Sequence, residues 1–372
     1  MRWLLGSALA FGVLSGAALS SARVPEGASV SRRLALMGTV LDLEVAAGTR
    51  DQALLASEAA VRAIEAAERR LSTWRPETEL SALGRAEAEL PVPISSELAA
   101  DLRSAFDCAQ ETGGAFDPTV GPLVHAWALR RGGRRPTVAE LLVARQATGY
   151  AGLRLGLDGA GRPFATRRHA GLVIEEGGFG KGAGLSSALV ALARSAGVSG
   201  AQLDFGGQVA VLGGRAVPVA LADPDRRERA VLELSIDRGS LSTSGNGERG
   251  ITIDGERIGH LLDPRSGRPA ADFGSLTVWT DDPLRADCLS TGLYVLGPEA
   301  ALDWAASRPG VEVVALVRDR TVAPGESPTV HALASAGWRG RLRPLADDVA
   351  IEFAPPTTTG ARRDRRAGES SS

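Results

Sequence analysis

The residues best suited to chemistry surround the chain's single lysine. Lys181, alone among 42 basic residues in being a lysine, lies in the run Glu175-Glu176-Gly177-Gly178-Phe179-Gly180-Lys181-Gly182. An ammonium group, glycines that permit close backbone approach and the start of a helix together favour phosphate oxygens. The run matches neither common phosphate-binding glycine motif in full, so a plain turn between two elements stays an alternative to a phosphate site.

Two further side chains could bind a cation. Asp287 and Thr291 are four residues apart in a segment that predicts a helix, so they share one face of it. A carboxylate and a hydroxyl suit Mg²⁺ or Ca²⁺, and a carbonyl of the glycine-rich run could supply a third oxygen. The alternative is structural: an acid near a helix N-terminus and a threonine that bonds back to its own helix.

His260 is a candidate general base. It is one of four histidines, and it follows a predicted hairpin and precedes Asp263-Pro264, which places it at a turn rather than in the core. Histidine titrates near neutrality and can take a proton from a hydroxyl unaided. Asp263 could orient the imidazole or simply begin the turn.

Hydrophobic spacing predicts the elements that position these groups. The alternating residues 41–45 and several later apolar runs indicate strands, and Asp254-Gly255 indicates a hairpin turn. The helices are predicted to be separate from the hairpins, which favours an α+β fold with mixed, largely antiparallel sheets flanked by helices. Helices are predicted at 51–71, 96–113, 137–149, 181–197, 286–291 and 298–307, and strands at 41–45, 172–174, 217–221, 231–236, 251–253, 276–279 and 311–317.

Composition limits the classes of partner. The chain has 372 residues, 44% hydrophobic and 23% charged, enough for a sizeable core. A formal net charge of −2 gives no reason to expect a nucleic-acid partner, and the arginines of 130–135 and 226–229 are interpreted as solvated surface. Cys108 and Cys288 could pair in an oxidising compartment, but buried free thiols are the favoured interpretation.

Both ends of the chain carry a signal. Residues 1–22 have the order of a secretory signal peptide, with the apolar run Leu4 to Leu19 and small residues before a cleavage site after Ala22. We therefore expect export to the periplasm or another extracytoplasmic space, without a lipid anchor because no cysteine lies nearby; an uncleaved membrane anchor is the alternative. One domain is expected over 23–354, helix-rich at first and strand-rich later, before a disordered tail at 355–372 that is rich in Pro, Thr, Arg and Ser.

Seven stretches, in this order, resemble motifs of the ApbE family, the FAD:protein FMN transferases. The resemblance runs from about Leu34 to about Gly340, nearly the whole expected domain. The stretches are Met37-Gly38-Thr39, Phe116-Asp117-Pro118-Thr119-Val120-Gly121-Pro122, Gly177-Gly178-Phe179-Gly180-Lys181-Gly182, Gly206-Gly207, Thr243-Ser244-Gly245, His260-Leu261-Leu262-Asp263-Pro264-x-x-Gly267 and Ala286-Asp287-x-x-Ser290-Thr291.

The resemblance implies an exported enzyme that moves FMN from FAD onto a threonine or serine hydroxyl of an acceptor protein and releases AMP. The cofactor would be Mg²⁺, with Ca²⁺ possible, and the acceptor is expected to be a membrane-associated redox protein. By matching motif positions, His260 would be the catalytic base, and the metal would be held by Asp287, Thr291 and the carbonyl of Gly178. The FAD would be lined by Met37, Trp74, Ala115, Phe116, Asp117, Glu175, Lys181 and Leu261.

Two other functions remain open at this point. A metal-dependent FAD pyrophosphatase would use water in place of the protein hydroxyl and give FMN and AMP, and a flavin-binding protein would have no turnover. The set His260, Asp287 and Thr291 argues against simple binding, which needs no base beside a metal. The chain departs from the family pattern at Glu175, where aspartate is usual, and at Gly247, which replaces an aromatic residue.

Overall fold

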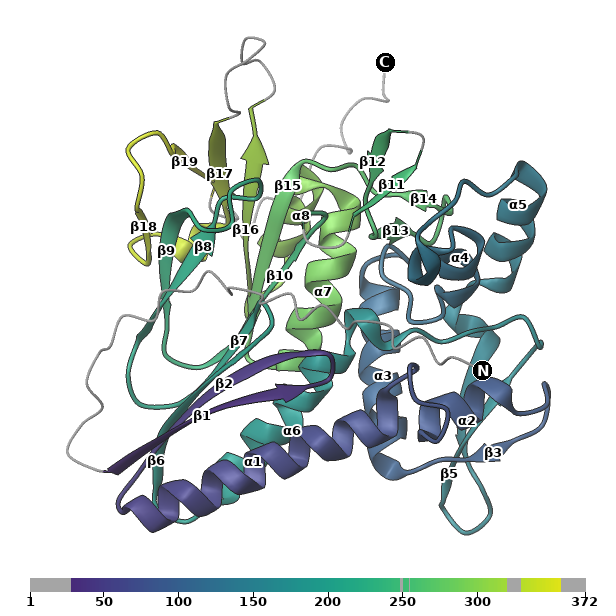
Figure 1. The fold of residues 1–372 in the computed structure, drawn as a ribbon, viewed down its shortest axis with the longest axis horizontal. Helices are drawn as coiled ribbons and strands as arrows, with labels where there is room; N and C mark the ends of the chain where they lie inside the picture. Colours follow the sequence, from purple (N-terminus) through teal and green to yellow (C-terminus); the bar gives the residue numbers. More distant parts are fainter. Residues whose placement is uncertain (1–27, 248–249, 254, 320–328, 356–372) are drawn as a thin grey trace, which may run out of the picture.

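The computed structural model describes residues 28–247, 250–253, 255–319 and 329–355. Its largest element is a nine-stranded sheet ordered β1-β2-β6-β7-β10-β15-β16-β17-β19 (Figure 1). Each neighbouring pair is antiparallel except β17 and β19, which are parallel. In that order the strands are Ala28–Leu36, Thr39–Ala47, Val198–Phe205, Gln208–Leu212, Gly239–Gly245, Gly274–Thr280, Val311–Arg318, Val330–Ala334 and Ile351–Phe353.

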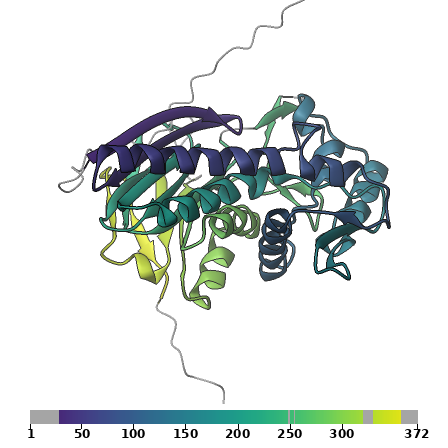
Figure 2. The same ribbon diagram turned by 90° about the horizontal axis from the view of Figure 1, so that it is seen from below.

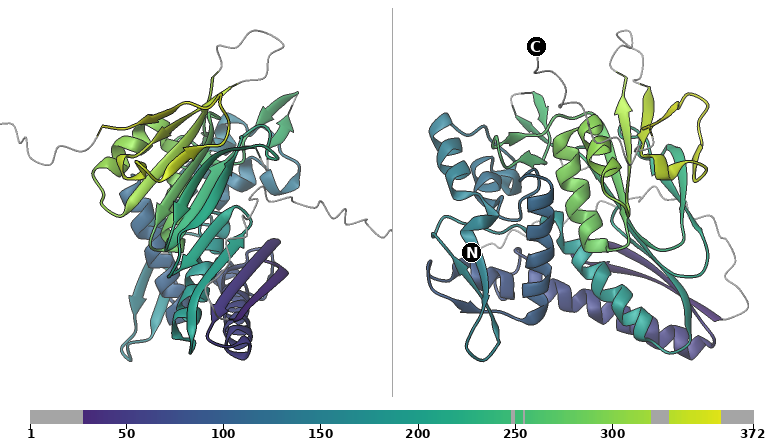
Figure 3. Two further views of the ribbon diagram at one scale, coloured as in Figure 1. Left: turned by 90° about the vertical axis from the view of Figure 1, so that its left-hand side faces the viewer. Right: turned by 180° about the vertical axis from the view of Figure 1, so that it is seen from behind.

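Helices cover one face of this sheet and a small sheet covers the other. Successive residues of a strand point to opposite faces, so Val313 and Ala315 of β16 pack with the helices, whereas Val314 and Leu316 pack with the small sheet. Figures 2 and 3 show these layers, with α1 and α6 side by side below β1 and β2. The helices are α1 (Arg50–Leu71), α3 (Ser96–Glu111), α6 (Gly180–Arg194), α7 (Pro283–Leu296) and α8 (Pro298–Ala306); the small sheet is β18 (Leu342–Pro344), β9 (Ala230–Ile236) and β8 (Val217–Ala222).

The remaining elements lie around and above α3, in the right half of Figure 1. Among them, α4, α5 and the two hairpins share a small core in which Trp127 and Leu262 are buried, whereas α2 and β3–β5 pack against the main core. The indole N–H of Trp127 donates to the carbonyl of Gly267 at 2.8 Å. This contact joins α4 to the hairpin that follows His260. The elements are α2 (Glu79–Arg85), α4 (Gly121–Ala126), α5 (Val138–Ala147), the sheet of β3 (Val92–Pro93), β5 (Pro163–Arg167) and β4 (Leu153–Leu157), and the hairpins β11–β12 (Ile251–Ile253, Glu256–Ile258) and β13–β14 (Leu262–Asp263, Arg268–Pro269).

The α+β fold predicted from the sequence is confirmed, and so are the helix starts that rest on capping residues. Ser95 caps α3, and Thr137 caps α5 in the predicted capping box. The predicted hairpin forms as β11–β12, although Asp254 itself lies outside the described residues. Cys108 and Cys288 are free and buried, as favoured.

One prediction of local structure was wrong, and two hairpins were not predicted. The apolar run 172–174 is not a strand of a sheet, and Val173 makes only one isolated bridge, to Val120. The run is apolar because Leu172 and Ile174 are buried in the main core, and burial alone does not require strand pairing. The predicted strand 41–45 lies within β2, but its hairpin partner β1 was not predicted; the two join at Met37-Gly38, with φ of 47° and 71°. The β6–β7 hairpin, which turns at Gly206-Gly207, was not predicted.

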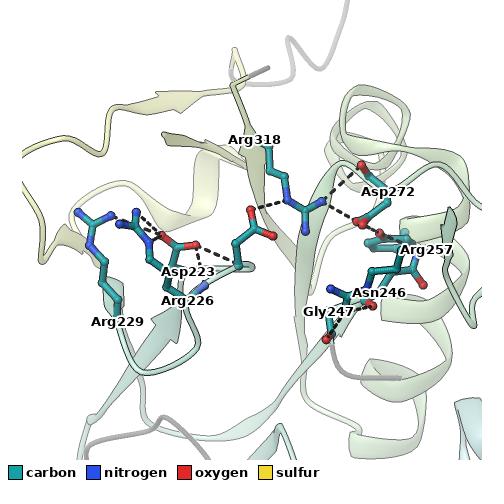
Figure 4. A network of polar contacts seen from close by, with 10 residues as sticks. Asp223, Arg226, Arg229, Asn246, Gly247, Arg257, Asp272 and Arg318 are labelled. Atoms are coloured by element: carbon teal, nitrogen blue, oxygen red, sulfur yellow. Dashed lines mark hydrogen bonds and ion pairs between the residues drawn. The ribbon is translucent and has the colours of Figure 1, made fainter. Parts of the chain in front are cut away.

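Arg130, Arg226 and Arg229 are less solvated than expected, whereas Arg131, Arg134 and Arg135 are exposed as predicted. Arg226 and Arg229 both pair with the carboxylate of Asp223, whose side chain is only 1% exposed (Figure 4). Arg130 is also engaged, as described below. These arginines therefore stabilise buried acids rather than form a purely solvated face.

No helix among the described residues is long and apolar enough to cross a membrane. The predicted signal peptide, residues 1–22, lies outside the described residues, and so does nearly all of the predicted disordered tail, namely 356–372.

The neighbouring strands β2 and β6 bring two acids together, which leads to a stability prediction. Asp42 faces Asp204 in the β2–β6 register, and burial, reinforced by the charge of Asp42, raises the pKa of Asp204 from 3.8 to about 6. The folded protein thus binds this proton more tightly than the unfolded chain, so stability is lost as the pH rises from about 4 to about 6. We expect Asp204→Asn to raise the free energy of unfolding at pH 7 by up to about 3 kcal/mol.

Urea unfolding at several pH values measures this effect. The difference between the wild-type protein and Asp204→Asn is expected to shrink toward zero below pH ~4, where the carboxyl is protonated in both states. Asp42→Asn is a useful second variant because it removes the neighbouring negative charge, together with an exposed ion pair to Arg33, and should give a smaller gain at pH 7. Parallel stability curves for the wild type and Asp204→Asn would contradict the assignment.

Candidate functional site

The glycine-rich run forms a tight turn that opens α6. Glu176–Gly178 make one turn of 3₁₀ helix, and α6 begins at Gly180. A Cβ on Gly182 would lie 2.5 Å from the carbonyl oxygen of Pro283, so only glycine allows α6 to approach α7 this closely. As a result the carboxylate of Asp287 accepts a hydrogen bond from the Gly182 N–H at 2.9 Å.

The three residues expected to hold a metal lie together at this contact. Asp287 and Thr291 are one turn apart on α7, and Asp287 is only 3% exposed. A Cβ on Gly178 would lie 3.3 Å from the hydroxyl oxygen of Thr291, which places the glycine turn directly beside that hydroxyl. Lys181 Nζ is 3.8 Å from the other oxygen of the Asp287 carboxylate. The cluster thus combines oxygen donors with an ammonium group at a helix N-terminus.

These donors fit a hard cation that also binds a phosphate ligand. Asp287 keeps one carboxylate oxygen that is not bonded to Gly182, and the Thr291 hydroxyl donates to the Asp287 carbonyl at 3.3 Å, which leaves its lone pairs to accept. Within the described residues no group of three or more His, Cys, Asp or Glu side chains could hold a metal by itself. A cation here would need oxygens from the backbone, from water or from a phosphate, the usual pattern for Mg²⁺.

Ser290 fixes α7 over β10. Its hydroxyl donates to the Asp287 carbonyl at 2.9 Å and lies 3.1 Å from the Ser242 hydroxyl and 3.0 Å from that of Ser244. The Thr-Ser-Gly motif of the sequence therefore supports Asp287 from the sheet.

Met37 and Phe116 reach the same glycine turn from two other elements. Met37, at the β1–β2 turn, places its Cε 3.6 Å from where a Cβ on Gly180 would stand. Phe116 places a ring carbon 3.0 Å from the equivalent position on Gly178, and both Ala115 and Phe116 are buried. The glycines thus make room for an apolar wall as well as for backbone approach.

Asp117 lies in the protein interior and organises this wall. Its carboxylate accepts hydrogen bonds from the backbone N–H and the hydroxyl of Thr119, at 2.8 and 2.6 Å, and from the N–H of Tyr150 at 2.9 Å. Burial raises the pKa of Asp117. Because its oxygens are occupied in this way, we interpret Asp117 as holding the segment next to Phe116 in place.

Trp74 and Glu175 are linked by an arginine that sequence reasoning missed. Trp74 is 68% exposed, and the Arg130 guanidinium lies 4.2 Å above its ring while it also bonds Glu175 and Thr73. Burial raises the pKa of Glu175 to about 7, although the charge of Arg130 opposes the shift. The interpretation of Arg130 as solvated was wrong, and no local motif could have revealed a contact across 45 positions.

His260 and Leu261 lie between β12 and β13, where two cores meet. The Leu261 side chain packs against the main core, whereas Leu262 joins the small core with α4 and α5. The Asp263 carboxylate accepts hydrogen bonds from the backbone and the side chain of Arg265, at 3.0 and 2.8 Å. Asp263 therefore begins the turn, which was one of the two roles left open for it.

Together these features define a class of site on an α+β fold. Oxygen donors for a hard cation, an ammonium group, a glycine turn at a helix N-terminus and a nearby exposed indole suit a ligand that carries both phosphates and an aromatic ring. The model of the ApbE family matches residues 37–315, more than half of the chain. The chain belongs to the ApbE family.

Known proteins agree with this assignment. A FAD:protein FMN transferase of Salmonella typhimurium is 31% identical over 258 residues, covering 67% of this chain and 73% of that protein. One from Treponema pallidum is 29% identical over 300 residues, covering 76% and 80%. The structure of the flavin transferase ApbE from Vibrio cholerae has a TM-score of 0.70 at 23% identity, covering 85% of this chain and 99% of that one, which supports the fold.

Proposed function

We propose that this protein is a FAD:protein FMN transferase that needs a divalent cation, Mg²⁺ or Ca²⁺, and that moves FMN from FAD onto a threonine or serine hydroxyl of an acceptor protein. The observation that carries this proposal is the meeting of Asp287, Thr291, Gly178 and Lys181 at the start of α6. Family membership and the similarity to FAD:protein FMN transferases support the same reaction.

The site binds the pyrophosphate of FAD through its charge. A cation held by Asp287, Thr291 and the carbonyl of Gly178 would neutralise the negative charge that builds up on the pyrophosphate. The Lys181 ammonium, 3.8 Å from the Asp287 carboxylate, would add a second positive charge, and the N–H groups that open α6 favour phosphate oxygens.

His260 acts as the general base in this proposal. It accepts the proton of the acceptor hydroxyl while the hydroxyl oxygen forms a bond to the phosphorus of the FMN half. The bond between that phosphorus and the bridging oxygen breaks, and AMP leaves with the electron pair. The products are the FMN ester of the acceptor and AMP. The surrounding residues must align the acceptor hydroxyl with the bond between phosphorus and the bridging oxygen.

We further propose that the protein is exported and acts on a redox protein associated with a membrane. The support is the apolar run Leu4 to Leu19, with its positive start and small residues before Ala22. An acceptor in the same compartment would meet the enzyme there.

The reaction is tested by incubating the purified protein with FAD and Mg²⁺, with and without an acceptor peptide that contains the threonine to be modified. A peptide heavier by one FMN, together with AMP, is the expected result. AMP with free FMN and no adduct would identify a pyrophosphatase instead, and intact FAD in both tubes would leave only binding. A third tube with excess chelator tests the cation requirement.

Trp74 offers a test of FAD binding that is separate from catalysis. We expect Trp74→Ala to weaken FAD binding roughly 10-fold, since stacking of a heteroaromatic ring on a side chain contributes about 1 to 3 kcal/mol. The fold should be unaffected because the side chain is exposed. Trp304→Ala is the control: Arg308 lies 4.0 Å above its ring, but Trp304 is on α8. Because Trp304 packs partly against the main core and donates to the Glu111 carbonyl, the folding of this variant is checked by its melting temperature. Equal FAD affinity of the two variants, measured by fluorescence titration, would remove Trp74 from the site.

A further inference from the structure

The residue that follows β10, Asn246, contacts the backbone on both sides of His260. Its Oδ1 accepts a hydrogen bond from the N–H of Leu261 at 3.3 Å. On the other side, a Cβ on Gly259 would lie 2.2 Å from the Asn246 Cγ, so the amide lies flat against a residue that must be glycine. Asn246 is 2% exposed. One buried amide therefore touches both neighbours of the proposed base.

A chain of hydrogen bonds determines the orientation of this amide. Arg318 Nη1 donates to Asp272 at 2.7 Å, and the Tyr294 hydroxyl donates to the same carboxylate oxygen at 3.0 Å. The Tyr294 oxygen then accepts from Asn246 Nδ2 at 3.2 Å. Because a carboxylate only accepts, tyrosine must donate to it, so the amide must present N–H₂ to Tyr294 and its oxygen to Leu261.

The chain is anchored in rigid parts of the fold. Tyr294, on α7, is 1% exposed and stacks on Phe273 with ring centroids 4.5 Å apart. Burial and the Asp272 charge raise the pKa of its hydroxyl above the ordinary value, so it remains a donor. Arg318, on β16, is held on its other side by Asp225 at 2.8 Å. Figure 4 shows Arg318 reaching Asp272, with Asn246 and Gly247 beyond it.

The backbone of Asn246 is held as well. Arg257, in the hairpin that leads to His260, donates to the carbonyl of Gly247 at 2.6 Å and to that of Asn246 at 3.4 Å. The Asn246 side chain therefore bonds the backbone next to His260, and the Arg257 side chain in turn bonds the backbone of Asn246 and Gly247. This arrangement fixes the end of β10 against the residues that flank His260.

We propose that Asn246 is a positioning residue for His260, and that Tyr294, Asp272 and Arg318 hold its amide in the one orientation that binds the Leu261 N–H. The proposal rests on the proposed function, in which His260 is the base. The rate of flavin transfer then also depends on a chain of buried polar side chains that runs from β16 through α7 to Asn246. This chain positions the imidazole by holding the backbone on either side of His260. An error in position of about 1 Å is enough to lower a rate by about 100-fold.

The test begins with three single variants of the full protein in the flavin transfer assay. We expect Asn246→Ala to lower kcat about 10- to 100-fold with little change in the KM for FAD. Tyr294→Phe keeps the ring stacked on Phe273 but frees the amide to rotate, so a smaller loss of kcat is expected. Ser335→Ala is the matched control. Ser335 follows β17, and its buried hydroxyl accepts a hydrogen bond from the Val313 N–H at 2.9 Å, so its loss should lower the melting temperature without changing kcat.

The decisive measurement is the double variant Asn246→Ala/His260→Ala. If Asn246 acts through His260, the double variant is no slower than His260→Ala alone. A further loss in the double variant, or a wild-type kcat in both Asn246→Ala and Tyr294→Phe, would overturn the proposal. If Asn246→Ala does not fold, Tyr294→Phe with its own His260→Ala double variant gives the same answer. A wild-type rate for His260→Ala would instead overturn the role of His260, and this inference with it.

Discussion

Replacing Asp287 with alanine is expected to reduce flavin transfer by roughly 1000-fold or more, because cation stabilisation of a phosphoryl transition state is worth several kcal/mol and each ~1.4 kcal/mol is a factor of ten. Asp287 is the only carboxylate in the proposed ligand set, and the other two ligands are neutral oxygens. Without it, the cation would have to be held by a hydroxyl, a carbonyl and the substrate phosphates. The measurement is the initial rate of FMN–peptide formation as a function of Mg²⁺ concentration.

A second variant separates the charge of Asp287 from its structural role. The carboxylate also accepts the N–H of Gly182 at the start of α6, so alanine leaves a buried donor unpaired at a cost of about 1 to 3 kcal/mol. The matched control is Asp287→Asn, because an amide oxygen at this position can still accept from Gly182 but carries no charge. For this control we expect near-normal stability and the same loss of activity. Full activity of either variant in excess chelator would remove the cation from the reaction.

Short motifs of the sequence predicted that these residues would lie together, because the motifs lie where the backbone itself brings α6 and α7 into contact. Gly182 has to be glycine for α6 to touch α7, and the i, i+4 spacing of Asp287 and Thr291 places both on one helix face. Such requirements are local, so a short stretch of sequence carries them. The capping residues Ser95 and Thr137 predicted helix starts for the same reason.

Long-range contacts were not visible in the sequence. Arg130 joins Glu175 across 45 positions, and Arg318 reaches Asp272 across 46, and neither arginine differs locally from a solvated one. The run 172–174 misled because burial alone makes a segment apolar, whatever its backbone conformation. Pairing between distant residues depends on how the layers pack, which periodicity does not encode.

His260→Ala is expected to slow transfer by roughly 100- to 10,000-fold while FAD remains bound, which is the usual effect of losing a general base. The residue lies at the junction of two cores, but Leu261 and Leu262 on its C-terminal side provide the packing there. Removal of the imidazole should therefore leave the hairpin in place. Single-turnover rates with saturating FAD and peptide separate the chemical step from binding.

The control for this variant is His331→Ala, on β17, which should keep the wild-type rate. FAD binding should distinguish the Asp287 and His260 variants. Asp287→Ala should weaken cation-dependent FAD binding. His260→Ala should leave FAD binding intact, because the imidazole acts on the acceptor hydroxyl rather than on the pyrophosphate. A loss of FAD affinity in His260→Ala would mean that the residue belongs to the nucleotide site. An unchanged single-turnover rate would mean that another group accepts the proton.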